Sequence, residues 1–161
     1  MSLCRTIGWS LLVSILVSGC VIETGVGFSI TPGTGNIREM LSRVLQIIQS
    51  LGGAEQHIKS MEGRPQNETY FVIPDEHSKN EVLYPGLWLI VDDQSNEISL
   101  RFFQFSRPFT PYAKDKLRTL YRSLSTSFSN DHMCIRYGIK QLRKLDIEDL
   151  PPECTKGQSR S

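Results

Sequence analysis

The sequence has few of the residues, and none of the spacings, that identify known kinds of enzyme. Its three histidines, His57, His77 and His132, stand far apart and fit no pattern of metal ligands or of nucleophile and base. A Gly-rich phosphate loop, a Cys-x-x-Cys pair and a Gly-x-Ser-x-Gly elbow are all missing. The usual signatures of metalloenzymes, nucleotide-binding enzymes, dithiol oxidoreductases and serine hydrolases are therefore lacking. We expect no catalytic residue, no metal and no cofactor.

One short segment could still hold a metal ion. Asp75-Glu76-His77 follows Pro74 in a polar stretch and offers carboxylates next to an imidazole. An isolated acidic segment of this kind is far more often a solvated turn, and we interpret it as one. A pocket in which a histidine converged on Asp75, Glu76 or Asp131 would favour an enzyme instead.

The chain also lacks a large excess of charge of either sign. Lys and Arg number 18 against 17 Asp and Glu, so the formal net charge is +1 and does not indicate nucleic acid. The distribution along the chain is nevertheless uneven. Residues 101–144 contain ten basic residues and two acidic ones, whereas residues 55–97 contain nine acidic residues and three basic ones.

Five basic residues are candidates for binding a partner or an anion. Lys114, Arg118 and Arg122 recur every four residues, opposite the apolar stripe of a predicted helix. Arg101 and Arg107 precede that helix. The pattern predicts either a solvated basic face or a surface that binds anionic lipid phosphates or an acidic partner.

The longest apolar run lies near the N-terminus and is too short to span a bilayer. Thr6–Val17 follows a single positive charge, Arg5, and is interrupted by Ser14. A spanning helix needs about twenty apolar residues. A basic residue followed by a short apolar segment is typical of an export signal, and we interpret residues 1–19 as a signal peptide.

The end of this segment, Val17-Ser18-Gly19-Cys20, resembles the lipobox of bacterial prolipoproteins, in which two small residues precede a cysteine. The resemblance covers about twenty residues and identifies no family for the rest of the chain. It implies cleavage before Cys20 and acyl chains on Cys20, which would tether the protein to a membrane. Val21 stands where an aspartate would signal inner-membrane retention in enteric bacteria, so the resemblance implies the outer membrane, facing the periplasm. Ordinary cleavage and an uncleaved anchor are the alternatives.

The sequence after Cys20 predicts a linker followed by one domain. Glu23–Gly35 is rich in Gly, Thr and Pro, so we interpret residues 20–35 as a flexible tether and residues 36–161 as a single domain with a C-terminal tail.

The predicted domain begins with an amphipathic helix, which Asn36 caps and Gly52-Gly53 ends. A second helix begins at Thr110-Pro111, a capping residue followed by proline. Extended segments are predicted at Thr69–Ile73, Leu87–Asp92, Glu97–Phe105 and His132–Tyr137. This order predicts a two-layer α+β fold, with both helices on one face of a mainly antiparallel sheet of about four strands.

Two cysteines remain available for a disulfide in an oxidising envelope. If Cys20 carries lipid, Cys134 and Cys154 are free to pair and would clamp the C-terminal tail against the domain. Two unrelated thiols are the alternative.

Together these observations favour a non-enzymatic envelope lipoprotein that binds a partner protein or an anionic envelope component, such as an immunity or assembly factor. The alternative is a periplasmic enzyme, for example a hydrolase, with a site that the sequence does not reveal.

Overall fold

The computed structural model describes residues 25–32, 35–56, 67–81, 84–105, 108–128, 132–145, 147 and 150–155. The lipobox, Cys20, His57 and Arg107 lie outside these residues. The elements, in chain order, are β1 (Val26–Ile30), α2 (Ile37–Ser50), β2 (Ala54–Glu55), β3 (Glu68–Val72), β4 (Gly86–Asp92), β5 (Glu97–Phe103), α3 (Pro111–Ser127), β6 (Met133–Tyr137) and α4 (Ile139–Arg143). None of the helices described is long and apolar enough to cross a membrane.

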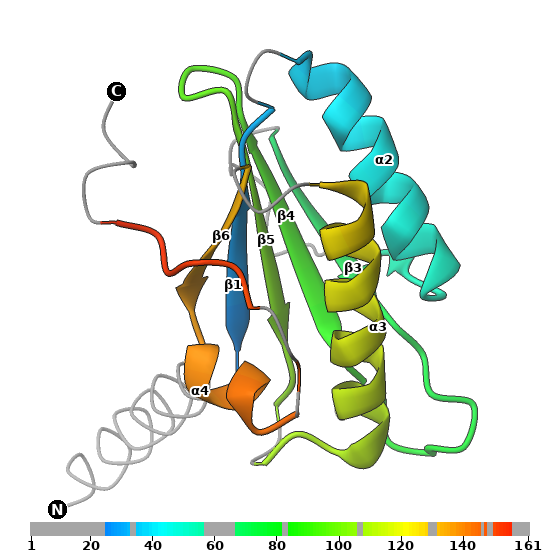
Figure 1. The fold of residues 1–161 in the computed structure, drawn as a ribbon. Coiled ribbons are helices and arrows are strands. Elements are labelled where there is room, and N and C mark those ends of the chain that lie inside the picture. Colours follow the sequence, from blue (N-terminus) through cyan, green and yellow to red (C-terminus); the bar gives the residue numbers. More distant parts are fainter. Residues whose placement is uncertain are drawn as a thin grey trace, which may run out of the picture.

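The architecture is the predicted two-layer α+β fold. Six strands form one sheet in the order β2-β3-β4-β5-β1-β6, and every neighbouring pair is antiparallel. The helices α2 and α3 lie against one another on the same face of this sheet (Figure 1). The prediction of about four strands was too low, because β1 and the two-residue β2 were not expected.

The strand β1 corrects the predicted tether. Val26–Ile30 was expected to be part of a flexible linker, but it is a buried strand that lies between β5 and β6. Its apolar residues Val26, Phe28 and Ile30 alternate with Gly27 and Ser29, which is the period of a strand with one face on the core. The small residues between them gave this segment the composition of a linker.

Both long helices begin where their capping residues predicted. The Asn36 side chain accepts a hydrogen bond from the backbone N–H of Arg38 at 2.9 Å, and Thr110 accepts one from Ala113 at 3.2 Å. Gly52, with a φ of 82°, follows the end of α2. The apolar stripes of the helices cover the sheet and form the core with it; the buried residues are Met40, Val44, Ile47 and Ile48 of α2, and Ala113, Leu117, Leu120, Tyr121 and Leu124 of α3.

The C-terminal tail covers the outer edge of β6. The Ile135 N–H donates to the Pro152 carbonyl at 2.9 Å, and the Cys154 N–H donates to the Ile135 carbonyl at 3.0 Å. A disulfide joins Cys134 to Cys154, which confirms the predicted pair. The tail thus satisfies backbone groups of an edge strand that would otherwise be open to another chain.

We expect the double substitution Cys134→Ser/Cys154→Ser to lower the free energy of unfolding by about 3 kcal/mol, because the bridge closes a loop of about twenty residues in the unfolded chain. Urea denaturation measures this change. Amide hydrogen exchange at Ile135 should become faster in the same variant, since the tail that accepts its N–H is no longer clamped. Unchanged exchange at Ile135 would show that the tail stays on β6 without the disulfide.

Candidate binding surface on the sheet

The face of the sheet opposite α2 and α3 carries the most distinctive side chains of the described part of the chain. Because side chains alternate along a strand, each strand that sends apolar residues into the core sends its other residues to this second face. On β5, Leu100 and Phe102 enter the core, whereas Arg101 and Phe103 lie on the second face. No described part of α2 or α3 covers that face (Figure 1).

A row of large side chains crosses this face from β3 to β6. The strand register aligns Tyr70 with Trp88, Trp88 with Arg101, Arg101 with Gly27, and Gly27 with Tyr137. Phe103 and Phe105 extend the row toward the end of β5. We call this surface the aromatic face; its residues are Tyr70, Trp88, Arg101, Phe103, Phe105 and Tyr137.

Neighbouring rings of the aromatic face are in contact with one another. The Tyr70 ring centroid lies 5.5 Å from that of Trp88 and 5.9 Å from that of Phe103. Phe105 meets Phe103 edge-on, with centroids 5.6 Å apart, and is 51% exposed. These separations are those of favourable aromatic pairs. The rings therefore support one another while Tyr70, Trp88 and Phe105 keep part of their surface in solvent.

Two glycines allow the rings to lie close to the sheet. A Cβ atom at Gly27 would overlap the Tyr137 ring, and one at Gly86 would come within 2.7 Å of Phe103 Cζ. Glycine inside a strand weakens the strand by itself but permits such a close approach. Tyr137 therefore lies across the β1 backbone, with the Arg101 guanidinium 5.4 Å from its ring centroid.

A buried polar cluster lies beside the aromatic face and joins three strands. Glu97 of β5 is only 6% exposed; it accepts hydrogen bonds from Ser29 Oγ of β1 at 2.6 Å and Ser99 Oγ at 3.1 Å, and it forms an ion pair with Arg136 of β6. A buried carboxylate is stable only when it is paired and hydrogen-bonded, and Glu97 is both. This cluster fixes the register of β5, β1 and β6 next to the row of rings.

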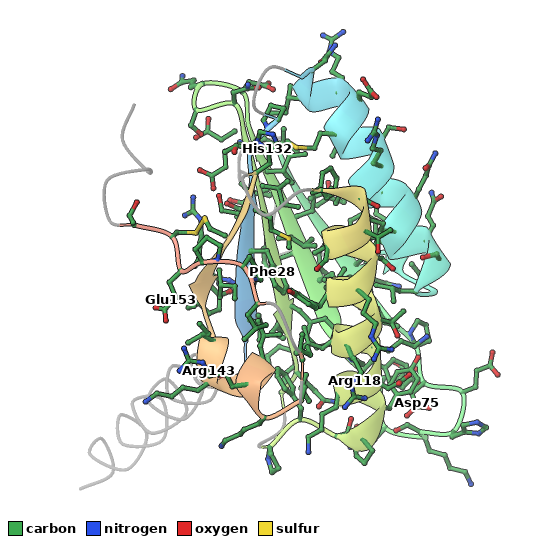
Figure 2. The ribbon with its side chains drawn as sticks, in the orientation of Figure 1. Phe28, Asp75, Arg118, His132, Arg143 and Glu153 are labelled. Carbon is green, nitrogen blue, oxygen red and sulfur yellow. A yellow bond between two sulfur atoms is a disulfide. The ribbon has the colours of Figure 1, made fainter. Side chains whose placement is uncertain are left out.

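The predicted basic residues do not form one surface. Arg101 lies on the aromatic face, whereas Lys114, Arg118 and Arg122 lie on α3, which packs on the other side of the sheet. Arg118 donates to the Leu145 carbonyl at 3.4 Å and lies 4.0 Å from Asp115 (Figure 2). Arg101 is thus on a different face of the domain from the three basic residues of α3. Arg107 lies outside the described residues.

The other candidates that lie within the described residues are Asp75, Glu76, His77 and His132; Asp131, like His57, lies outside them. The Asp75 carboxylate accepts a hydrogen bond from the backbone N–H of His77 at 3.0 Å, which is the turn geometry that we expected for this segment. His132 lines a hollow of about 300 Å³ between the first turn of α2 and the last turn of α3, well away from Asp75 (Figure 2). In the part of the chain that the structure describes, no three His, Cys, Asp or Glu residues converge on a possible metal position.

Comparison with known proteins adds no relative. No protein-family model matches the chain, and no curated protein matches its sequence. The function must therefore be inferred from the surface itself.

Sequence reasoning missed most of the aromatic face. Trp88 belongs to the continuous apolar run Leu87–Val91, which lacks the alternation that would separate exposed from buried side chains. In the structure Leu87 and Leu89 are buried, whereas Trp88 and Ile90 keep part of their surface exposed. The available signal was weak: in each of β3, β4 and β5 one aromatic residue, Tyr70, Trp88 or Phe103, alternates with positions that form the core.

Tyr137 yields a prediction about stability and pH. Its hydroxyl is buried and makes no hydrogen bond with the described residues. Burial raises the pKa of Tyr137, and the nearby Arg101 guanidinium opposes part of that rise. A raised folded-state pKa gives stability that is present below the ordinary tyrosine pKa of about 10 and is lost as the pH rises through the folded-state value.

We therefore expect Tyr137→Phe to raise the free energy of unfolding by about 1 kcal/mol at neutral pH, because it removes an unsatisfied buried hydroxyl. It should also reduce the loss of stability above pH ~10. Urea denaturation at neutral and alkaline pH measures both effects. The matched control is Tyr84→Phe, which removes a hydroxyl that donates to the Ser78 carbonyl at 3.1 Å and should cost about 1 kcal/mol. Equal losses in the two variants would contradict the assignment.

Proposed function

We propose that this chain is a lipid-tethered, non-enzymatic binding protein of the bacterial envelope, which captures a partner protein through the aromatic face. The observation that carries the proposal is the row of Tyr70, Trp88, Arg101 and Tyr137 across a sheet face that α2 and α3 leave uncovered. Tryptophan, tyrosine and arginine are the residues most enriched at the centres of protein interfaces and among their energetic hot spots.

The charge of the aromatic face favours a protein partner over an anionic polymer. Binding a polyanion requires several cations whose charge is available. Among the described residues of this face the cations are Arg101 and the adjacent Arg136, and Arg136 forms an ion pair with Glu97. Arg101 is exposed and offers a planar guanidinium, which suits a single carboxylate surrounded by apolar side chains. A protein surface supplies that combination.

The lipid anchor and the envelope location belong to the same proposal. The lipobox-like segment ending at Cys20 and the disulfide between Cys134 and Cys154 both fit an exported protein in an oxidising compartment. Val21 favours the periplasmic face of the outer membrane. An immunity factor, which blocks a toxin by binding it, and an assembly factor are both proteins of this kind, because neither needs catalytic residues.

The anchor is tested by the intact mass of the protein purified from bacterial membranes. We expect a mass that corresponds to cleavage before Cys20 plus acyl chains, and we expect Cys20→Ser to lose both the acyl mass and the membrane association. A soluble chain without acyl groups, obtained from the unsubstituted sequence, would refute the lipoprotein proposal.

The binding surface is tested by site-specific photo-crosslinking in cells. A photoreactive residue at position 88 should form an adduct of one defined mass, and Arg101→Glu should remove that adduct because it places a negative charge where the partner presents a carboxylate. The matched control position is Gln46, which is exposed on α2, in the other layer. Adducts at position 46 with none at position 88 would assign binding to the helical layer and overturn the proposal.

A further inference from the structure

The first described residues of the domain leave little chain between the anchor and the sheet. Gly25 precedes β1 and is five residues from Cys20, so even a fully extended connection spans at most about 18 Å. If Cys20 carries lipid, the end of the domain at which β1 begins is held within that distance of the bilayer. This inference rests on the lipid anchor of the proposed function.

Several segments meet at this same end of the domain. Gly138, the residue before α4, packs against Gly25, since a Cβ atom there would lie 2.5 Å from the Gly25 carbonyl oxygen. The strand register places Phe102 opposite Val26, so β5 ends where β1 begins. Figure 1 shows α4 beside the start of β1, at the end of the molecule opposite the first turn of α2.

The side chains exposed at this end suit a lipid surface. Lys140, Arg143 and Lys144 are exposed on α4 and directly after it, and Figure 2 shows Arg143 pointing away from the domain. Phe105 is 51% exposed; it is the exposed large apolar residue of the described chain and lies two residues beyond the end of β5. Basic residues attract anionic headgroups, and an aromatic ring partitions into the interfacial region of a bilayer.

We propose that α4 and Phe105 form a membrane-contacting surface, which binds the anionic phospholipid headgroups of the bilayer that holds the lipid anchor. Lys140, Arg143 and Lys144 bind the phosphates. Phe105, at the membrane end of the aromatic face, enters the headgroup region of the bilayer and leaves the row of Tyr70, Trp88, Arg101 and Tyr137 to the partner protein. In this orientation the strands of the sheet point away from the bilayer, and the aromatic face is roughly perpendicular to the membrane plane. A partner reaches that face from the side, along the membrane surface.

Acidic residues near α4 oppose this attraction. Asp146, Glu148 and Asp149 follow it in the sequence, and their side chains lie outside the described residues. The proposal requires that the cations of α4 still dominate the charge that the bilayer meets. Charge reversal at Lys140 and Arg143 tests this requirement.

The experiment uses tryptophan fluorescence in the acylated, full-length mature protein. The variant Trp88→Phe/Phe105→Trp is compared with the unsubstituted protein, whose mature chain has Trp88 as its tryptophan. Both are reconstituted in vesicles of phosphatidylcholine, with or without phosphatidylglycerol, that contain lipids brominated near the headgroup. We expect the tryptophan at position 105 to lose most of its emission in the anionic vesicles, and Trp88, which lies farther from the β1 start of the sheet, to lose clearly less.

Two double variants are made in the Trp88→Phe/Phe105→Trp background. They distinguish headgroup binding by α4 from quenching that arises only because the anchor holds position 105 near the bilayer. Lys140→Glu/Arg143→Glu should restore most of the emission at position 105. Arg38→Glu/Arg122→Glu changes the charge by the same amount elsewhere on the domain and should leave the quenching unchanged. High salt should also restore the emission, because the Debye length falls from about 10 Å at 0.1 M to about 3 Å at 1 M.

The outcomes distinguish this inference from the function on which it rests. A protein that carries no acyl mass contradicts the lipid anchor, whatever the fluorescence shows. Acylated protein in which position 105 is quenched no more than position 88, or in which the two double variants behave alike, overturns the membrane-contacting surface and leaves the anchor intact.

Discussion

The strand β1 is the constraint on which the rest of the domain depends. It pairs with β5 on one side and β6 on the other, so it joins the β3-β4-β5 part of the sheet to β6, α4 and the tail. Val26, Phe28 and Ile30 are fully buried under the helices, and Gly27 receives Tyr137 on the opposite face. Partners of β1 lie about seventy residues or more away in the sequence, so the sheet can be completed only after long loops have closed.

Polar chemistry strengthens the same junction. Glu97, Ser29 and Arg136 come from the three strands that meet there, and their hydrogen bonds and ion pair are of the charge-assisted kind. Hydrogen bonds to a charged group contribute about 1.5–3 kcal/mol, and loss of Arg136 would leave the buried Glu97 carboxylate with its two serine hydroxyls but without that ion pair. The cluster therefore specifies the register of β5, β1 and β6. That register, in turn, aligns Arg101 with Trp88 and Tyr137 on the aromatic face.

The sequence was sufficient for the elements whose causes are local. Asn36 and Thr110 predicted where the long helices begin, and the apolar stripes predicted the face that each helix buries. The disulfide was predicted instead from the number of cysteines that acylation of Cys20 would leave free. The sequence was insufficient for β1, because Gly27 and Ser29 gave that segment the composition of a linker. A glycine in a strand is explained only by what lies against it, and the Tyr137 ring comes from more than a hundred residues later in the chain.

The aromatic face was beyond prediction for a related reason. Each of its residues is an ordinary aromatic or basic side chain in its own strand, and only the order β3-β4-β5-β1-β6 brings them into one row. The basic residues show the opposite effect, in which residues that are close in the sequence lie on different faces of the domain. Arg101 and Arg118 are close in sequence and similar in charge, and the sheet separates them because residue 101 points away from the layer that contains α3.

The position of β1 also shortens the connection between the proposed lipid anchor and the folded domain. A flexible tether over residues 20–35 would have had a root-mean-square length of about 20–24 Å and would have let the domain tumble above the membrane. If Cys20 is acylated, five residues connect it to Gly25, just before the sheet begins at Val26, and that end of the domain stays within about 18 Å of the bilayer. When the domain is held near the membrane in this way, a partner that is also bound to the membrane has a high effective concentration at the aromatic face. A partner that is free in solution does not gain this advantage. On the proposed anchor, the short connection favours a partner that is itself associated with the membrane, which is a narrower class than the envelope proteins that the sequence alone allowed.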